Sequence, residues 1–266
     1  PPRSPVSVAA LESVVGSGRF EVVACLRTRE GATPRKPNSL VAYSLDPNTK
    51  KWQGPRAILA DGRPIQGMTC GDEEEPERPA SGRFIQSTFG QQGNFELLIP
   101  QGPRLVHYWQ DNDAAGQPWH RTPDLPLPTP TPGPSGLPTP LGTALLQSNL
   151  NNPGDLHAVV RMRPAGDMTG TADFLVHYLF DSPTKAWKLL GPVMADGQPV
   201  KGITGTPAFI RSTWGKQGNF ELLAPQGPRL VHYWRDNDAA GQPWRSAPDL
   251  PLPEPAPGAP GPLVPV

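Results

Sequence analysis

Two segments of the sequence carry the same set of aromatic, charged and amide side chains. Residues 89–119 and residues 214–244 differ at only four of 31 positions. Flat rings beside guanidinium, imidazole, carboxylate and amide groups suit a sugar, because a sugar offers C–H faces for stacking and hydroxyls that need both donors and acceptors. The predicted ligand-binding residues are Arg104, His107, Tyr108, Trp109, Asp111, Asn112 and Trp119 in the first segment, and Arg229, His232, Tyr233, Trp234, Asp236, Asn237 and Trp244 in the second.

A structural role is the alternative interpretation of these residues. Tyr and Trp side chains commonly pack between neighbouring sheets, and His107 could form a hydrogen bond across such a contact. The two related segments around Tyr43 and Tyr178 have no Trp after the Tyr. The sequence therefore predicts two equivalent sugar sites rather than four.

The common catalytic motifs are missing from the sequence. It contains no HExxH, no GxSxG and no phosphate-binding glycine loop. A glycan-cleaving enzyme needs two convergent carboxylates, for which Glu96 with Asp111, and their copies Glu221 with Asp236, are conceivable pairs. The spacing does not bring either pair together. We therefore expect no catalysis and keep a glycan-cleaving enzyme as an alternative.

The acidic run 111–113, repeated at 236–238, has part of the character of a calcium loop. It lacks the alternating ligands and the closing glutamate of an EF-hand, and Asp and Asn are frequent turn residues. Cys25 and Cys70 have neither zinc-type spacing nor His partners nearby. We expect no cofactor, with calcium as the alternative. The two cysteines form a disulfide or stay a free buried pair.

The composition argues against several classes of partner. The 266 residues include 24 Lys and Arg and 24 Asp and Glu, so the net charge is zero. Nucleic-acid binding and polybasic membrane attachment both need a positive excess. No apolar run of 18 residues is present and the first residues show no signal-peptide pattern, so we expect no membrane insertion. Homo-oligomer formation stays open, as does the compartment, with secretion favoured.

The repeats predict the elements that must position these residues. The chain holds 38 Pro and 28 Gly, and interior proline disfavours long helices. The sequence divides into four related modules of short strands, separated by turns rich in Gly, Pro, Asn and Asp. In the second module the strands are expected at about 83–88, 94–99, 104–110 and 119–121.

Four short antiparallel strands per repeat are typical of a propeller blade. We therefore predict an all-β fold, a four-bladed β-propeller built from a duplicated two-blade unit. The blades are expected at about 8–60, 83–128, 143–195 and 208–253 of one domain spanning 1–266, with a Pro-rich tail at 254–266. Two small sandwiches, or part of a larger propeller completed by a second chain, are the alternatives.

The run Gly-Asn-Phe-Glu-Leu-Leu, followed by Arg-Leu-Val-His-Tyr-Trp, resembles the blades of the Photorhabdus and Psathyrella velutina type of β-propeller lectins. Both even modules carry it, and the segment 18–21 is similar to the opening of the pattern. The residues that match the family's Glu, His and two Trp are Glu96, His107, Trp109 and Trp119, with Glu221, His232, Trp234 and Trp244. The resemblance implies sugar sites between adjacent blades and no catalysis.

The functional prediction is a carbohydrate-binding lectin that recognises glycans or glycoconjugates. Two sites on one chain would favour multivalent surfaces through effective concentration. The alternative of another class is a non-catalytic protein-interaction scaffold. Its Pro-rich segments 122–140 and 248–266 would then serve as polyproline II ligands rather than stiff spacers.

Overall fold

The computed structural model describes residues 3–15, 18–28, 38–66, 68, 82–129 and 136–252, with the side chains of 3–7, 27 and 28 left out. These residues form twenty strands and no helix, which confirms the all-β prediction. In this part of the chain no helix is long and apolar enough to span a membrane. The chain divides into two compact units, Pro1–Pro126 and Leu127–Val266, and each holds one copy of the repeat.

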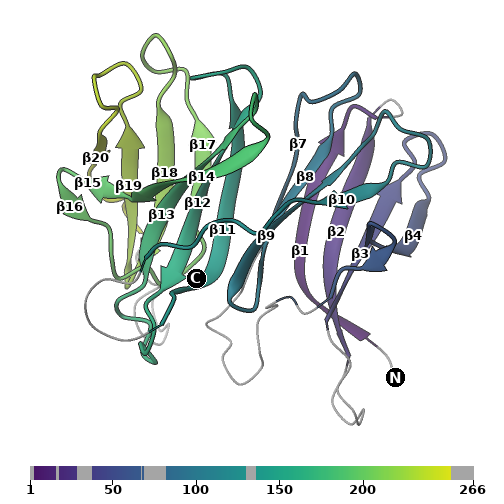
Figure 1. Cartoon of the computed structure of the whole chain (residues 1–266), viewed down its shortest axis with the longest axis horizontal. Helices are drawn as coiled ribbons and strands as arrows, with labels where there is room; N and C mark the ends of the chain where they lie inside the picture. Colours follow the sequence, from purple (N-terminus) through teal and green to yellow (C-terminus); the bar gives the residue numbers. More distant parts are fainter. Residues whose placement is uncertain are drawn as a thin grey trace. The chain divides into compact units, whose positions relative to one another are not determined.

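The first sheet of the first unit is a four-stranded antiparallel meander. Its strands follow the chain in the order β1 (Arg3–Ser13), β2 (Arg19–Thr28), β3 (Ser39–Leu45) and β4 (Trp52–Ala57) (Figure 1). Because side chains alternate along a strand, Arg19, Glu21, Val23 and Cys25 share one face of β2. Val23 and Cys25 belong to the core of the unit, so this face points inward.

The second sheet of the first unit has six strands, in the order β6-β5-β10-β9-β8-β7. Their bounds are β5 (Leu59–Ala60), β6 (Arg63–Pro64), β7 (Arg83–Gln86), β8 (Phe95–Gln101), β9 (Arg104–Gln110) and β10 (Trp119–Arg121). The last four confirm the strands expected from the sequence. The short hairpin β5–β6 was not expected in this sheet. It follows β4 along the chain, but Ala60 pairs in parallel with Trp119 of β10.

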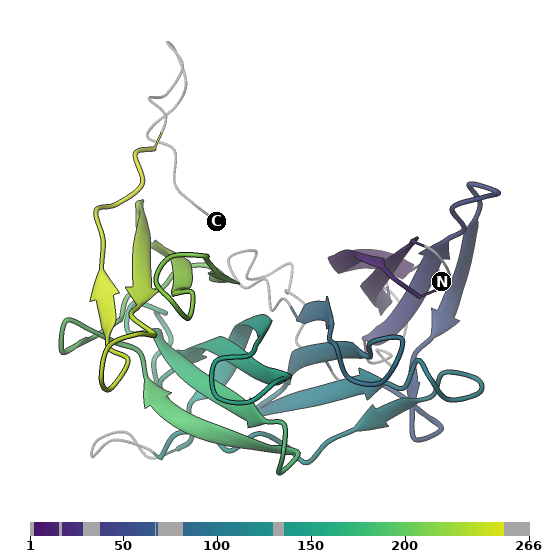
Figure 2. The same cartoon turned by 90° about the horizontal axis from the view of Figure 1, so that it is seen from above.

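One apolar core joins the two sheets of the first unit. It contains Val23 and Leu40 from the first sheet and Phe95, Leu97 and Trp119 from the second. Figure 2 shows the two sheets of this unit as separate layers, purple to blue and teal, that face each other. The inward side chains of β2 therefore meet those of β8 to β10.

The second unit repeats this arrangement. A four-stranded meander consists of β11 (Thr139–Ser148), β12 (Asp155–Arg163), β13 (Phe174–Asp181) and β14 (Ala186–Pro192). The six-stranded sheet consists of β15 (Met194–Ala195), β16 (Gln198–Pro199), β17 (Ala208–Arg211), β18 (Phe220–Gln226), β19 (Arg229–Arg235) and β20 (Trp244–Ser246). Its core again joins both sheets, through Val159 and Leu175 with Phe209, Phe220 and Trp244.

The cysteine prediction and the tail prediction extend beyond the described residues. Cys25 is disulfide-bonded, and the sequence contains one other cysteine, Cys70, which lies outside the described residues. The Pro-rich tail 254–266 and part of the linker, 130–135, also lie outside them.

Candidate active site

The side chains predicted to bind a sugar do not gather on one surface of their sheet. Strand β9 alternates, so His107 and Trp109 lie on one face, whereas Tyr108 lies on the opposite face with Val106. Tyr108 is buried, and its hydroxyl donates to Gln101 Oε1 at 3.1 Å. Trp109 stacks against His120, with ring centroids 4.5 Å apart.

His107 belongs to a buried hydrogen-bond network. Its Nε2 lies 2.8 Å from Oε2 of Glu96, and the Ser87 hydroxyl donates to the other oxygen of that carboxylate at 2.7 Å. The second unit has the same pair, His232 and Glu221, also at 2.8 Å. The pairing joins neighbouring strands of one sheet rather than two sheets, so it differs from the bond that the alternative interpretation expected, but it gives the histidine a partner within the fold. It also occupies the carboxylate that a glycan-cleaving pair would need.

The acidic run 111–113 organises turns. Asp111 Oδ1 accepts the backbone N–H groups of Asp113 and Ala114, and the Asp113 carboxylate accepts those of Gln91 and Gln92. Asn112 is buried and donates to the Gly93 carbonyl at 2.6 Å. These contacts are the turn chemistry that the sequence indicated. Among the described residues no group of three or more His, Cys, Asp or Glu side chains could hold a metal ion.

The remaining predicted residues lie apart from one another. Arg104 is exposed, with its Nη1 3.7 Å from Oδ2 of Asp124. Trp119 is buried in the core between the sheets, and its copy Trp244 has the same place in the second unit. As ligand-binding residues the set stays a prediction, although the structure gives most of its members partners within the fold.

A pocket of about 360 Å³ lies between the two sheets of the first unit. Its walls come from β2, β4 and the first residues after β4 on one side, and from β7 to β10 with the loop 116–118 on the other. Its volume is at the small end of the range typical of ligand pockets. Trp119 is the one member of the predicted set that lines it.

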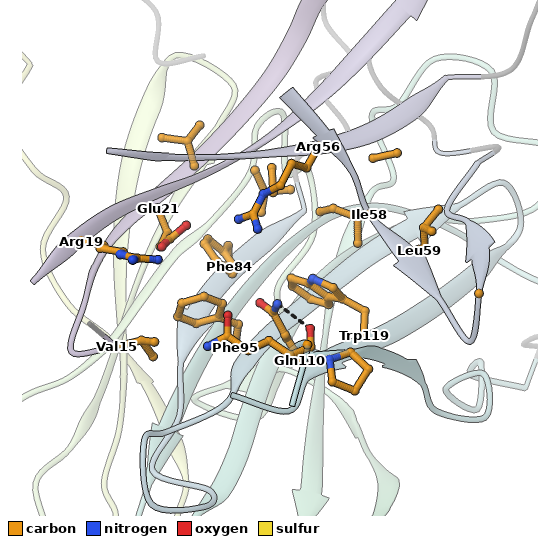
Figure 3. Close-up of a pocket in the computed structure, with 18 residues that line it drawn as sticks. Val15, Arg19, Glu21, Arg56, Ile58, Leu59, Phe84, Phe95, Gln110 and Trp119 are labelled. Carbon is orange, nitrogen blue, oxygen red and sulfur yellow. Dashed lines mark hydrogen bonds between the residues drawn. The ribbon is translucent and has the colours of Figure 1, made fainter. Parts of the chain in front are cut away.

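Glu21 is the one acidic residue among the described residues that line this pocket. Figure 3 shows its carboxyl between the guanidinium groups of Arg19 and Arg56, on the side of the pocket opposite Trp119. Glu21 is only 8% exposed. Burial raises the pKa of Glu21 above its usual range, and the charges of Arg56 and Arg19 partly oppose that rise. A carboxyl in this environment keeps its proton at higher pH than one in water.

The floor of the pocket is aromatic. Phe84 and Phe95 meet edge to face, with ring centroids 5.2 Å apart, and Trp119 lies 6.5 Å from Phe84. The Gln110 amide at the rim donates to the Gln117 carbonyl at 2.8 Å. The pocket thus combines an apolar floor for a flat ligand face with an acid, two cations and an amide for its polar groups.

In the second unit the corresponding positions hold other side chains. The aligned strands place His157 where the first unit has Glu21, and His177 where it has Ala42. Nδ1 of His157 lies 3.1 Å from Nε2 of His177, and the His157 ring packs on Phe220 with centroids 4.6 Å apart. Two imidazoles therefore stand on the aromatic floor of the second unit.

These histidines are held in their neutral form. Burial lowers the pKa of His157 to about 3. It also lowers the pKa of His177 well below its usual range, with smaller contributions from His157 and from Arg235. The guanidinium of Arg235 lies 5.5 Å from the centre of the Phe220 ring, and burial lowers its pKa to about 10. With their pKa values lowered, these imidazoles hold no extra proton to donate near neutral pH, whereas the raised pKa of Glu21 helps that carboxyl to keep its proton.

Sequence reasoning did not single out Glu21, Arg19 or Arg56 as site residues. The sequence did contain a signal for Arg19 and Glu21. Both alternate in register with Val23 and Cys25, which face the core, so two charged residues occupy the inward positions of one strand. Charged residues at inward positions are rare and need a reason. Arg56 gave no such signal, because it comes from β4, where every residue is exposed.

The sheets are arranged as several blades of a β-propeller-type fold. Solved structures share this fold. NanB in complex with Optactamide matches at 9% identity with a TM-score of 0.57, over 92% of this chain and 48% of that one. A family 117 glycoside hydrolase of the marine bacterium Zobellia galactanivorans matches at 12% identity with a TM-score of 0.52, over 95% of this chain and 76% of that one. The chain thus spans about half the length of the NanB structure.

Other comparisons found no match. No protein-family model matches the sequence. No curated protein matches it either. The resemblance to the lectin family therefore stays a prediction from the residues quoted for it.

The prediction of a lectin without catalysis is wrong against these comparisons. Among the solved structures that share the fold is a family 117 glycoside hydrolase, a carbohydrate-active enzyme rather than a lectin. The duplicated residues are conspicuous in the sequence, but the structure gives most of them hydrogen-bond or packing partners within the fold. The pocket lies instead between the two sheets of the first unit, and Trp119 is the one predicted residue that lines it.

Proposed function

We propose that the chain is a carbohydrate-processing enzyme whose active site is the pocket between the two sheets of the first unit. The observation that carries the proposal is Glu21, a buried acid with a raised pKa that lines a cavity over an aromatic floor. Perturbed acids in ligand-sized cavities are the usual mark of proton-transfer sites. The fold of NanB and of the glycoside hydrolase supports carbohydrate chemistry by analogy.

Hydrolysis of a glycosidic bond is the reaction that this acid serves best. Glu21 would donate its proton to the glycosidic oxygen as the bond from that oxygen to the anomeric carbon breaks. Because Glu21 is the one acidic residue of the described lining, it would serve in both steps. Ionised by that transfer, it would take a proton from the water molecule that adds to the anomeric carbon as the hydroxyl of the new sugar end. This departs from the two-carboxylate arrangement that most glycosidases use. The rings of Phe84, Phe95 and Trp119 would hold the apolar face of the sugar, and the Gln110 amide would meet its hydroxyls.

The test is turnover of a panel of nitrophenyl glycosides and end-labelled oligosaccharides, followed by absorbance and mass spectrometry. We expect product with the full chain and a loss of roughly 100- to 10,000-fold with Glu21→Gln, which keeps the shape and removes the proton. His157→Gln is the matched control, because it changes the corresponding position of the second unit. The absence of any product, or equal turnover by Glu21→Gln, would overturn the proposal.

The number of blades is also a proposal. Four main sheets, two from each copy of the repeat, support a four-bladed propeller formed by one chain over 1–266, as the sequence predicts. Analytical ultracentrifugation separates this from the alternative of a larger propeller completed by a second chain. A monomer with full turnover supports the four-bladed form, and an obligate dimer contradicts it.

A further inference from the structure

The charges at the pocket of the first unit bear on the kind of sugar it takes, an inference that rests on the function proposed above. Arg19 and Arg56 bring two positive charges to the wall, and Glu21 brings the one acidic group of the described lining. The wall is therefore net positive whether or not Glu21 holds its proton. This positive charge is local, because the net charge of the whole chain is zero.

Within the described part of the chain, neither arginine has a hydrogen bond or an ion pair that would occupy its donors. Most other arginines with defined contacts are already engaged by carboxylates, as Arg121 is by Asp124, and Arg161 and Arg163 are by Asp173. Among the described residues, Arg19 and Arg56 form no such direct ion pair. Both lie close enough to Glu21 to influence its pKa, and Arg19 also influences that of Asp46, which lies outside the lining. A guanidinium presents a planar fork of N–H donors that matches a carboxylate.

The blade architecture does not require these arginines. The second unit forms the same pair of sheets with Asp155 at the position of Arg19 and Gly191 at the position of Arg56. Its aromatic floor is kept without these two arginines, and the cation over one of its rings is Arg235, which comes from β19 and lies 5.5 Å from the centre of the Phe220 ring. The pair Arg19 and Arg56 is thus specific to the first unit, and the shared arrangement of sheets does not require it.

We propose that the pocket binds an acidic sugar, with the sugar's carboxylate held by Arg19 and Arg56 and its ring on the aromatic floor. The pocket's small volume suits a single sugar unit rather than a long stretch of glycan. Selection would be electrostatic, since a neutral sugar of the same shape leaves both guanidinium groups without an anion.

The experiment is an NMR titration of the full chain with matched acidic and neutral sugars. The probes are D-glucuronic acid against D-glucuronamide, and N-acetylneuraminic acid against its methyl ester, so that each pair differs in charge and little else. We expect at least one acid to bind roughly 10- to 100-fold more tightly than its neutral partner. The preference should shrink between 20 mM and about 500 mM NaCl, because salt screens a half-exposed charge pair.

Three variants locate the preference on the chain. Arg56→Gln and Arg19→Gln should each remove most of it, and Arg56 is exposed, so its replacement leaves the core intact. Arg83→Gln is the control, since Arg83 is an exposed arginine of the same unit outside this pocket. Thermal melting of each variant verifies the fold.

The outcomes separate this inference from the proposed function. Equal binding of acid and amide, or a preference that survives both arginine variants, overturns the inference while turnover of neutral glycans still supports an enzyme. Acid-selective binding without turnover of any glycan supports the inference and contradicts the enzyme. No binding and no turnover overturn both.

Discussion

The two units share an aromatic floor and differ in what stands on it. Phe84 and Phe95 lie 5.2 Å apart at 71°, and their counterparts Phe209 and Phe220 lie 5.4 Å apart at 78°. The tryptophan is equally well kept, at 6.5 Å and 34° from Phe84 in the first unit and at 6.2 Å and 39° from Phe209 in the second. The apolar framework is therefore common to both.

Above this floor the chemistry of the two units diverges. The first unit has an acid between two cations at the wall of a cavity, and the second has a neutral imidazole pair packed on the rings. The difference shows that the floor is part of how these blades pack, whereas the polar residues above it are free to change. Under the proposed function, the positions at which the two copies differ are therefore the ones to test.

The largest expected effect is on activity, and it distinguishes Glu21 of the first unit from His157 at the corresponding position of the second. Glu21→Gln should lower turnover by roughly 100- to 10,000-fold, and His157→Gln should leave it unchanged, because only the first can supply a proton at the pocket. Steady-state kinetics of both variants make the measurement. Since the pKa of Glu21 is raised, activity should persist above the usual range of a carboxyl and fall as the pH rises further.

The next effect concerns the Glu–His pair, which is the same in both units but differs in burial. Side-chain exposure is 1% for His107 and 2% for Glu96, against 21% for His232 and 9% for Glu221. Removing one partner of a buried pair costs about 3–5 kcal/mol, so Glu96→Ala should approach that range. Glu221→Ala should cost about 1–2 kcal/mol, because water can reach its partner.

Urea denaturation of the two variants gives these free energies of unfolding. Glu96→Gln and Glu221→Gln are the controls that keep the side-chain volume. Equal losses for the two alanine variants would show that burial does not distinguish the pairs.

A third effect is the response of the second unit to acid. The pKa of His157 is about 3 in the fold and near 6.5 in an unfolded chain, so the unfolded state binds more protons between these values. Stability should therefore fall as the pH drops below about 6.5, by up to about 1.4 kcal/mol per pH unit for each buried histidine. His177, whose pKa is also lowered by burial, adds to the same slope.

Hydrogen exchange of the β12 and β13 amides between pH 7 and pH 4.5 measures this loss in the second unit. Amides of β2 and β3 serve as the contrast. Glu21 stands there in place of His157, and because its pKa is raised in the fold, it should make the first unit gain stability as the pH falls. The double variant His157→Gln with His177→Gln should flatten the slope in the second unit. A slope that persists in that variant would assign the acid sensitivity to other groups.

The smallest effect should be equal in the two units. Asp113 accepts the Gln92 N–H at 2.9 Å, and Asp238 accepts the Gln217 N–H at 3.0 Å, with both side chains at exposed turns. Asp113→Ala and Asp238→Ala should each cost about 0.5–1.5 kcal/mol, as expected for an exposed side-chain to backbone hydrogen bond. Thermal melts that differed clearly between the two would mean that the turns are not equivalent.

Local features of the sequence determined the strands and turns. The alternation in the segment 104–110 and the Gly, Pro, Asn and Asp residues around it act over a few residues, so β9 and its neighbours were predictable. The duplication likewise predicted that each sheet would occur twice. The turn role of Asp111 was predictable for the same reason, because its partners are two and three residues away.

Tertiary packing alone decided the site and one strand pairing. The hairpin β5–β6 joins the second sheet through Ala60 and Trp119, which are far apart in the chain, and no local pattern encodes that partner. Glu21 and Arg56 come from different strands, and they meet Phe95 and Trp119 only because two sheets pack face to face. Periodicity determines which side chains share a face of one strand, but the opposing surface, and with it the burial that raises the pKa of Glu21, depends on long-range contacts that a single strand does not specify.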